Sequence, residues 1–529
     1  MNVRSTLLLS TALILPLGFA EAADLPVTKG APIEYVRVCS AYGAGFFYIP
    51  GTETCLRVSG RARYEYQYTE TLSRSAGDVS GYRGLARINL DARTQTDYGT
   101  LRAFVRLEAA SRSGAYIGGN SQARLGNGFR ALGIDTFGRV TQYVNTDKAF
   151  IQLAGFTAGR ASSFYDFYAH DYEMIGYTGG SDMASTNLLA YTATLGNGFS
   201  TTLSMEDPSF RWQPVFTNGS TALGLSPFNA FNGPTSAFSP VFLSYNAAGI
   251  PTSVTFADTR QRNRTPDAVA VLRYDGPWGA AQLSAAMHEV NVGNYSQLLG
   301  VNGGATPASA AVGRVPSEYG WAVQAGVKLN AAAVAPGDGF YLQGSYGVGA
   351  MSYTGFIQPV DYQTTNAQIF NGAPLTNYIS DGVINPFTRR LELSESWTIV
   401  GSYLHYWNPE WRSAVFASYG EAYFSKTARY GLGLVGFDLP NPTTVAGANA
   451  FRYSNVLRDN SVLYTGMNLI WSPVKNLDIG VEGVYQRSGI VGGQVADANR
   501  ALGAVNGVPL RAVSSADNGM VRFRVQRDF

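Results

Sequence analysis

Hydrophobic and polar residues alternate along much of this chain, and the pattern continues to its last residue. In the closing stretch MVRFRVQRDF, one side of an extended strand is apolar: Val521, Phe523, Val525 and Phe529. The other side is polar: Arg522, Arg524, Gln526 and Asp528. Arg527 is the one exception, because it is a charged residue at a position on the apolar side. Because side chains alternate across a strand, this segment is expected to meet an apolar medium on one face and water on the other. An edge strand of a soluble protein would give the same pattern.

The same alternation recurs in three runs near the start of the chain, CLRVSGRARYEYQY, GYRGLARINLDAR and LRAFVRLE. In the first run the apolar side consists of Leu56, Val58, Ala62, Tyr64, Tyr66 and Tyr68. Arginines occupy the opposite side of all three runs. Each run therefore predicts a strand that is long enough to span a membrane and has one wet face.

Seven segments rich in Gly, Pro, Asn and Asp predict tight turns, at residues 95–99, 144–148, 196–198, 275–279, 330–339, 407–411 and 471–476. Eight longer connections separate them, near Thr69, Ser111 and Ala161 and at residues 207–266, 291–318, 353–395, 421–460 and 488–518. Seven turns and eight loops join about sixteen strands. Because alternation is weak at residues 139–144 and 340–353, a count of about fourteen or eighteen strands is the alternative. The predicted fold class is an all-β transmembrane antiparallel barrel.

A sheet can span a membrane only if it closes on itself, because every backbone group in lipid must be paired. The final strand is therefore expected to pair with the first, with both termini on the side of the short turns. Phe529 would then lie in an interfacial aromatic girdle, together with tryptophans at the turns: Trp278, Trp407, Trp411 and Trp471.

Composition narrows the class of protein further. The chain has 529 residues, with 60 Gly, 32 Tyr and 28 Phe but only 14% charged residues. Its net charge of +2 is too small for a nucleic-acid footprint, so no nucleic-acid partner is expected. Only five residues are lysines, so nearly all of the 39 basic residues are arginines, whose planar cations stay charged.

The N-terminus predicts a signal peptide at residues 1–22, with Arg4 before an apolar stretch and small residues around the cleavage site. Residues 23–529 would form a single barrel domain. Cys39 and Cys55 then belong to an exported chain, in which a disulfide between them would persist. Free thiols are the alternative.

The three histidines, His170, His288 and His405, are scattered and match no zinc or haem spacing, so no metal or cofactor is expected. His170 and Asp171, beside Asp166, form the single acid and histidine cluster in which a general base could reside. Polar lining of a pore explains this cluster better, because no activated serine or threonine stands out. The chain is not expected to be an enzyme.

Arginines cluster on the water-facing side of the first three predicted strands and of the last one. Closure of the barrel would make these four strands neighbours. These arginines are Arg57, Arg61, Arg63, Arg83, Arg87, Arg93, Arg102, Arg106, Arg522 and Arg524. A cationic wall inside the lumen is the favoured interpretation. Structural ion pairs with Asp91 and Glu108 are the alternative for part of the cluster.

The third long connection contains no basic residue between Arg160 and Arg211, and it carries four acids: Asp166, Asp171, Glu173 and Asp182. If it folds into the barrel, its carboxylates would face the arginines and set a transverse field across a constriction. A solvated external loop is the alternative.

The runs AYGAGFFYIPGTETCLRVSGRARYEY, TDYGTLRAFVRLE, AFIQLAGFTAGRASSFYDF and TNLLAYTATLGNGFS resemble the alphaproteobacterial general porin family. The resemblance implies a sixteen-stranded, trimeric outer-membrane barrel that forms a passive diffusion channel, constricted by its third loop. It also implies contact with outer-membrane lipid and lipopolysaccharide, and a terminal Phe529 that resembles the signal read by the barrel assembly machinery. The long fourth connection, residues 207–266, exceeds the usual size in the family.

Two other functions remain open at the level of sequence. A substrate-specific channel would use the aromatic residues of the third connection as a slide for a sugar or other nutrient: Tyr165, Phe167, Tyr168 and Tyr172. A barrel with a plugged lumen could instead act as an enzyme or an adhesin.

Overall fold

The computed structural model describes residues 37–70, 79–114, 133–134, 141–183, 185–216, 228–229, 233–234, 238–296, 311–356, 367–368, 373–436, 439–500 and 503–529. The predicted signal peptide at residues 1–22 lies outside these ranges and stays a prediction. Among the described residues, none of the helices is long and apolar enough to cross a membrane.

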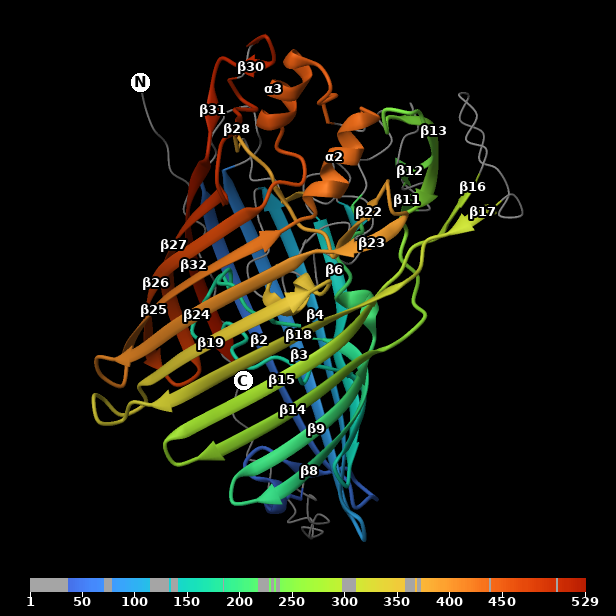
Figure 1. The fold of residues 1–529 in the computed structure, drawn as a ribbon. Coiled ribbons are helices and arrows are strands. Elements are labelled where there is room, and N and C mark those ends of the chain that lie inside the picture. Colours follow the sequence, from blue (N-terminus) through green and yellow to red (C-terminus); the bar gives the residue numbers. More distant parts are fainter. Residues whose placement is uncertain are drawn as a thin grey trace, which may run out of the picture.

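Sixteen antiparallel strands form a closed barrel (Figure 1). In chain order they are β2 (Cys55–Thr69), β3 (Ser80–Thr96), β4 (Gly99–Gly114), β6 (Thr141–Leu153), β7 (Phe156–Ala161), β8 (Thr186–Gly196), β9 (Phe199–Glu206), β14 (Asp267–Gly276), β15 (Gly279–Val290), β18 (Glu318–Asn330), β19 (Gly339–Val348), β24 (Glu395–Tyr406), β25 (Trp411–Tyr423), β26 (Asn460–Val474), β27 (Leu477–Ile490) and β32 (Ser515–Asp528). The last strand pairs with the first, from Arg61 opposite Asp528 to Thr69 opposite Met520. The predicted strand number and closure are confirmed.

Burial alternates along the barrel strands as the sequence pattern predicts. In β2, Arg63, Glu65 and Gln67 are buried, whereas Tyr64 and Tyr68 on the opposite side of the strand are about half exposed. The exposed positions form the apolar outer wall, and the buried ones point into the barrel.

Short turns join the strands at one end of the barrel, and long connections join them at the other end (Figure 1). One predicted turn is wrong. Residues 144–148 lie within β6, and the chain reverses instead at residues 154–155, between β6 and β7. The polar run is a β-bulge: the register with β4 shifts where Arg106 opposes Lys148 and Leu107 opposes Thr146. Bulges and turns share the same polar composition, so the sequence did not separate them.

The long connections contain small helices and strands of their own, at the end of the barrel opposite the short turns. These are β10 (Phe228–Asn229), β11 (Gly233–Pro234), β12 (Phe238–Tyr245), β13 (Pro251–Asp258), β16 (Asn294–Ser296), β17 (Ala311–Arg314), β20 (Ala367–Gln368), β21 (Asn377–Tyr378), β22 (Gly382–Asn385), β23 (Arg390–Leu393), β28 (Val495–Ala496), β29 (Ala504–Val505), β30 (Val508–Pro509), β31 (Ala512–Val513), the 3-10 turns η2 (Pro208–Phe210) and η5 (Met351–Thr354), and the helices α2 (Lys426–Leu434) and α3 (Val445–Tyr453). Ser425 and Thr444 cap the two helices, because their side-chain oxygens accept hydrogen bonds from Ala428 N and Gly447 N.

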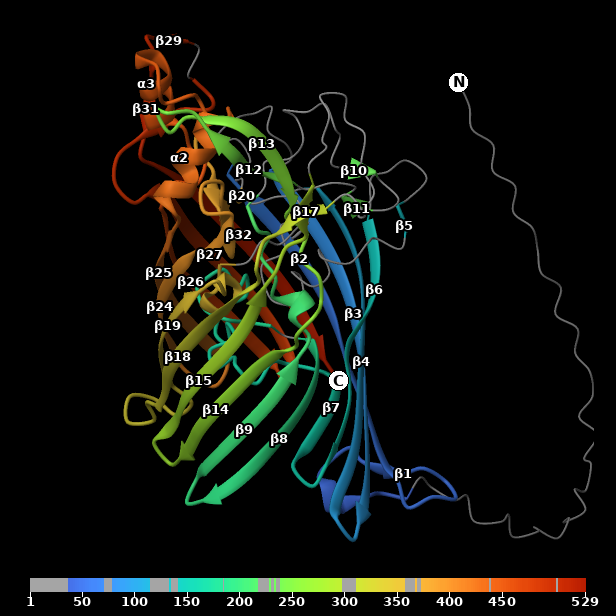
Figure 2. The ribbon, with the colours of Figure 1, turned by 45° about the vertical axis from the view of Figure 1, so that its right-hand side comes forward.

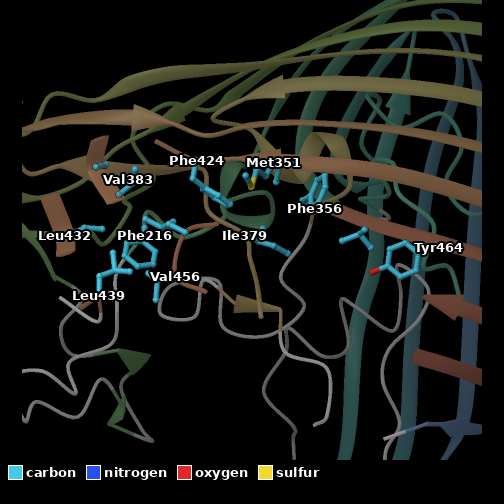
Figure 3. Close-up of a cluster of buried hydrophobic side chains, with 14 of the residues drawn as sticks. Phe216, Met351, Phe356, Ile379, Val383, Phe424, Leu432, Leu439, Val456 and Tyr464 are labelled. Atoms are coloured by element: carbon cyan, nitrogen blue, oxygen red, sulfur yellow. The ribbon is translucent and has the colours of Figure 1, made fainter. Parts of the chain in front are cut away.

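The long connections pack against one another around a hydrophobic core, which we call the mouth cluster (Figure 3). Ile175, Phe216, Met351, Val383 and Leu432 are fully buried in it, and they come from four different long connections. The long connections therefore form a packed structure at the end opposite the short turns, because the apolar side chains of separate loops bury one another.

The N-terminal part of the described chain lies at the end with the short turns (Figure 2). It contains η1 (Ser40–Tyr42) and β1 (Phe47–Tyr48), and β1 pairs with the start of β2. Cys39 and Cys55 form a disulfide with their Cα atoms 6.0 Å apart, which confirms the predicted bond. A short strand β5 (Gly133–Ile134) pairs with the start of β6.

Candidate functional site

The third long connection, residues 162–185, is anchored at both ends to the β6 bulge. Lys148 Nζ donates a hydrogen bond to Ser162 Oγ at its start. Ser185 Oγ at its end donates to Asp147, whose Oδ1 lies 2.8 Å away. A bulge turns two consecutive residues toward the same side, which a regular strand cannot do. The misassigned turn is thus the anchor of this connection, which we call the L3 segment.

The backbone of the L3 segment is bound by inward-facing side chains of distant strands. Glu482 on β27 accepts hydrogen bonds from Met174 N, at 2.6 Å, and from Ile175 N. Asn468 Nδ2 on β26 donates to Tyr172 O over 2.7 Å. These partners replace the water that free loop amides and carbonyls would need.

Three further strands bind the first half of the segment. Gln343 Oε1 on β19 accepts from Tyr168 N at 2.9 Å. Gln282 Nε2 on β15 and Gln324 Nε2 on β18 both donate to Tyr165 O, over 3.2 Å and 3.0 Å. All three glutamines are buried. These five strands, β15, β18, β19, β26 and β27, therefore all supply fixed partners to one loop.

Two of the four predicted acids of the L3 segment, Glu173 and Asp182, are buried, Asp166 is partly buried, and all three have partners. Asp166 forms a 3.1 Å ion pair with Arg211. Glu173 accepts a hydrogen bond from Tyr168 OH at 2.8 Å, and burial, reinforced by Glu173, raises the pKa of that phenol. Asp182 lies 2.8 Å from His170 Nδ1. These carboxylates are bonded within the segment or to its neighbours.

Asp171 differs from the other three acids because its residue is exposed. One carboxylate oxygen accepts a hydrogen bond from Tyr341 OH over 2.7 Å. It is therefore the one exposed carboxylate among the four predicted acids of the segment.

His170 is held by two acceptors, one on each ring nitrogen. Nδ1 faces Asp182 Oδ2, and Nε2 lies 2.7 Å from the carbonyl oxygen of Thr178. Both ring nitrogens of His170 therefore take part in hydrogen bonds within the L3 segment. The backbone of His170 is left-handed, with φ 58°. These contacts pair His170 with Asp182 and hold the fold of the loop.

The predicted arginines of β2, β3, β4 and β32 all lie at strand positions that face the inside of the barrel. Four of them share two buried glutamates. Glu65 pairs with Arg63 at 3.6 Å, Arg83 at 3.2 Å and Arg522 at 3.7 Å. Glu108 then pairs with Arg87 at 2.7 Å, and Arg83 lies 4.0 Å from it. Four guanidinium groups against two carboxylates leave a net positive charge in this group.

The remaining arginines lie nearer the end with the short turns. Asp91 binds both Arg93 and Arg102, with contacts of 2.8 Å and 2.9 Å. Asp528 binds Arg61 at 2.6 Å, and Asp147 binds Arg106 at 3.4 Å.

Two of the predicted arginines lack such a partner. Within the described chain, Arg57 and Arg524 have no carboxylate within ion-pair distance. The alternative of structural ion pairs thus applies to most of the wall, and a net positive charge remains on it.

Comparison with known proteins identifies the family. Residues 24–503 match the sequence profile of the family described as Porin subfamily. The chain belongs to this family. This porin is 37% identical over 235 residues to porin Omp2b of Brucella suis, an alignment that covers 41% of this chain and 56% of that protein. It is 37% identical over 218 residues to porin Omp2b of Brucella abortus (strain 2308), covering 39% and 54% of the two chains. The alignment thus spans little more than half the length of these relatives.

Solved structures with a similar outline include the outer membrane channel DcaP of Acinetobacter baumannii, with a TM-score of 0.48 and 14% identity over 91% of this chain and 99% of that chain. The anion-selective porin from Comamonas acidovorans gives a TM-score of 0.42 and 10% identity over 90% and 100% of the two chains. The resemblance to alphaproteobacterial porins is confirmed by the family match and the Brucella relatives. The family places this porin in the bacterial outer membrane, and its members are channels rather than enzymes.

The aromatic residues that a sugar slide would need are largely buried in this porin. Tyr165 and Tyr168 are fully buried, and Phe167 is nearly so. Tyr165 packs edge-on against Tyr353 with ring centroids 4.7 Å apart, and Phe167 packs against Tyr341 at 5.6 Å. Their position favours packing of the L3 segment over contact with a solute.

Several residues of the site were missed by sequence reasoning. Arg211, which binds Asp166, carries no pattern apart from being the first basic residue after the acidic loop. In the sequence, Glu482 and Asn468 look like ordinary polar residues on the water-facing side of a strand, because their loop partners lie about 300 positions away. Among the described residues, no three His, Cys, Asp or Glu side chains are grouped closely enough to hold a metal ion.

Proposed function

We propose that this porin forms a passive, water-filled channel through which small hydrophilic solutes and ions diffuse across the outer membrane. The L3 segment would constrict this channel, facing the arginine wall. The observation that carries the proposal is the set of inward-facing side chains that bind the segment's backbone: Gln282, Gln324, Gln343, Asn468 and Glu482. Three of these residues lie on strands about halfway round the barrel from β2.

A charge difference across the constriction follows from this arrangement. The wall on β32, β2, β3 and β4 retains positive charge after its ion pairs are counted, and Arg524 has no carboxylate partner among the described residues. The L3 segment presents the exposed Asp171. Fixed charges on opposite sides of a narrow pore orient water and favour polar solutes over apolar ones.

We further propose that the functional unit is a homotrimer in outer-membrane lipid and lipopolysaccharide, inserted by the barrel assembly machinery through a signal that ends at Phe529. Family membership supports the trimer, since related porins are typically trimeric. The apolar outer wall supports the contact with lipid, with half-exposed side chains such as Leu203, Leu283 and Met467.

The test is planar-bilayer recording of the refolded mature protein in a salt gradient. We expect ohmic channels whose reversal potential shifts toward anion preference in Asp171→Asn and toward cation preference in Arg524→Gln. Asp97→Asn, at the exposed turn after β3, is the matched control and is expected to leave the potential unchanged. A silent bilayer would refute the channel. Open channels that ignore both substitutions would refute the proposed constriction.

A further inference from the structure

A cavity of about 400 Å³ lies where the L3 segment leaves the barrel wall. We call it the root pocket. Its lining comes from β6, β7, β8, β9, β14 and β15 and from the first residues of the L3 segment. This volume falls at the small end of the range for ligand sites.

Among the described residues that line the root pocket, Lys148 is the cation with no carboxylate within ion-pair distance. Asp166 is neutralised by Arg211 at 3.1 Å. Arg273 is neutralised by Asp275, with two contacts of 2.8 Å. Lys148 has a different environment, because its ammonium group donates to the neutral hydroxyl of Ser162. An ammonium group has three N–H donors, so two more can be offered to a ligand.

The rest of the lining is hydroxylated on one side and aromatic on the other. Thr157, Thr192, Ser200 and Thr202 bring hydroxyl groups to the pocket, and Phe150 and Phe164 bring ring surface. Such a lining offers a cation for a carboxylate, hydroxyls for polyol oxygens and an apolar surface for C–H groups.

We propose that the root pocket is a binding subsite for a small hydroxylated carboxylate, such as a sugar acid, with Lys148 as the residue that binds the carboxylate. The inference rests on the proposed channel, because a solute reaches the pocket through the lumen. It adds a preferred solute class to a pore that otherwise discriminates by size and charge.

The test is calorimetric titration of the detergent-solubilised trimer or monomer with sodium gluconate, with glucose as the uncharged probe. We expect saturable binding of gluconate and binding of glucose weaker by at least about ten-fold, the scale of one charge-assisted contact. Lys148→Met is expected to weaken gluconate binding by a similar factor, and Lys148→Arg to retain most of it. Equal affinity for glucose and gluconate, or no gluconate binding, would overturn the subsite.

Two controls separate ligand binding from loop anchoring and from lumen charge. Ser162→Ala breaks the bond between Lys148 and the L3 segment but keeps the ammonium, so gluconate binding is expected to survive. Lys328→Met removes an inward-facing lysine that lies over the Tyr341 ring, outside the root pocket, and is expected to change binding less than about two-fold. If either control weakens binding as much as Lys148→Met, the proposal fails.

The same preparations are recorded in potassium chloride. Conductance without gluconate binding would refute the subsite alone. Gluconate binding without conductance would refute the proposed channel and leave the subsite.

Discussion

The ring of Phe529 lies directly over Gly60, where the barrel closes. Gly60 N donates to Phe529 O over 2.9 Å, and Phe529 N donates to Gly60 O over 3.1 Å. A Cβ atom on Gly60 would lie 2.3 Å from the Phe529 ring and 2.6 Å from the backbone oxygen of Arg87. The last residue of the chain therefore fits a position that only glycine leaves open.

We predict that Gly60→Val weakens barrel closure by overpacking, at a cost of about 1–3 kcal/mol. The measurement is the temperature at which the folded, heat-modifiable band is lost in gel electrophoresis, which should fall. Gly84→Val on β3 is the matched control, because a Cβ there would meet no atom within 4 Å. The prediction fails if the two variants melt alike. In a Phe529→Ala background, Gly60→Val should be less harmful than in the wild type.

Removal of the Glu482 carboxylate is predicted to loosen the tip of the L3 segment. Glu482→Ala leaves Met174 N and Ile175 N without their acceptor, and each unsatisfied buried amide costs about 1–3 kcal/mol. The barrel strands are unaffected, so we expect open channels with larger current fluctuations than the wild type.

Glu482→Gln serves as the control for that substitution, because its amide oxygen can still accept one of the two bonds. It should give intermediate noise in single-channel recordings. Wild-type noise in Glu482→Ala would show that the segment does not depend on this anchor.

The disulfide is predicted to stabilise the N-terminal segment and not the barrel. Replacing Cys39 and Cys55 by serine removes a cross-link whose entropic contribution is about 3 kcal/mol in the loop-closure model. The bonds from Cys39 N to Phe46 O and from Tyr48 N to Arg37 O, each 2.9 Å, should then exchange faster with deuterium. Amides of β2 opposite β32 should keep their protection, since that pairing does not involve the cysteines. Loss of protection in β2 would contradict the prediction.

The barrel could be predicted from sequence because its pattern is local. Strand parity, the number of strands and the pairing of β32 with β2 all follow from a period of two and from the need to close a sheet in lipid. The inward parity of the ten arginines follows in the same way.

The site could be predicted only in part, because its contacts are long-range. The sequence marks Asp166, Glu173 and Asp182 as acids, but their partners depend on how the loop folds: Arg211, Tyr168 and His170. The sequence does not distinguish the bulge at Asp147 from a turn, since both use small polar residues. Neither composition nor periodicity shows that these acids have such partners and that Asp171 is exposed.

The last prediction concerns Asp381, a buried carboxyl in the connection before β22. It accepts hydrogen bonds from Gln213 N at 2.7 Å and Met351 N at 2.8 Å, and His288 Nε2 lies 3.8 Å away. Burial raises the pKa of Asp381 from its usual 3.8 to about 6, although His288 and the two amides oppose this rise.

Because the folded state holds this proton more tightly than the unfolded state, Asp381 contributes stability that is complete below about pH 4 and is lost as the pH rises through about 6. A pKa raised from 3.8 to about 6 corresponds to a change in unfolding free energy on the order of 3 kcal/mol between the ends of that window. Asp381→Asn cannot titrate, so the difference in unfolding free energy between wild type and variant should change across this window, with the wild type losing stability relative to the variant as the pH rises. The measurement is urea unfolding in lipid vesicles at several pH values between about 4 and 7. A difference that stays constant with pH would show that Asp381 keeps the same charge in both states and would sink the prediction.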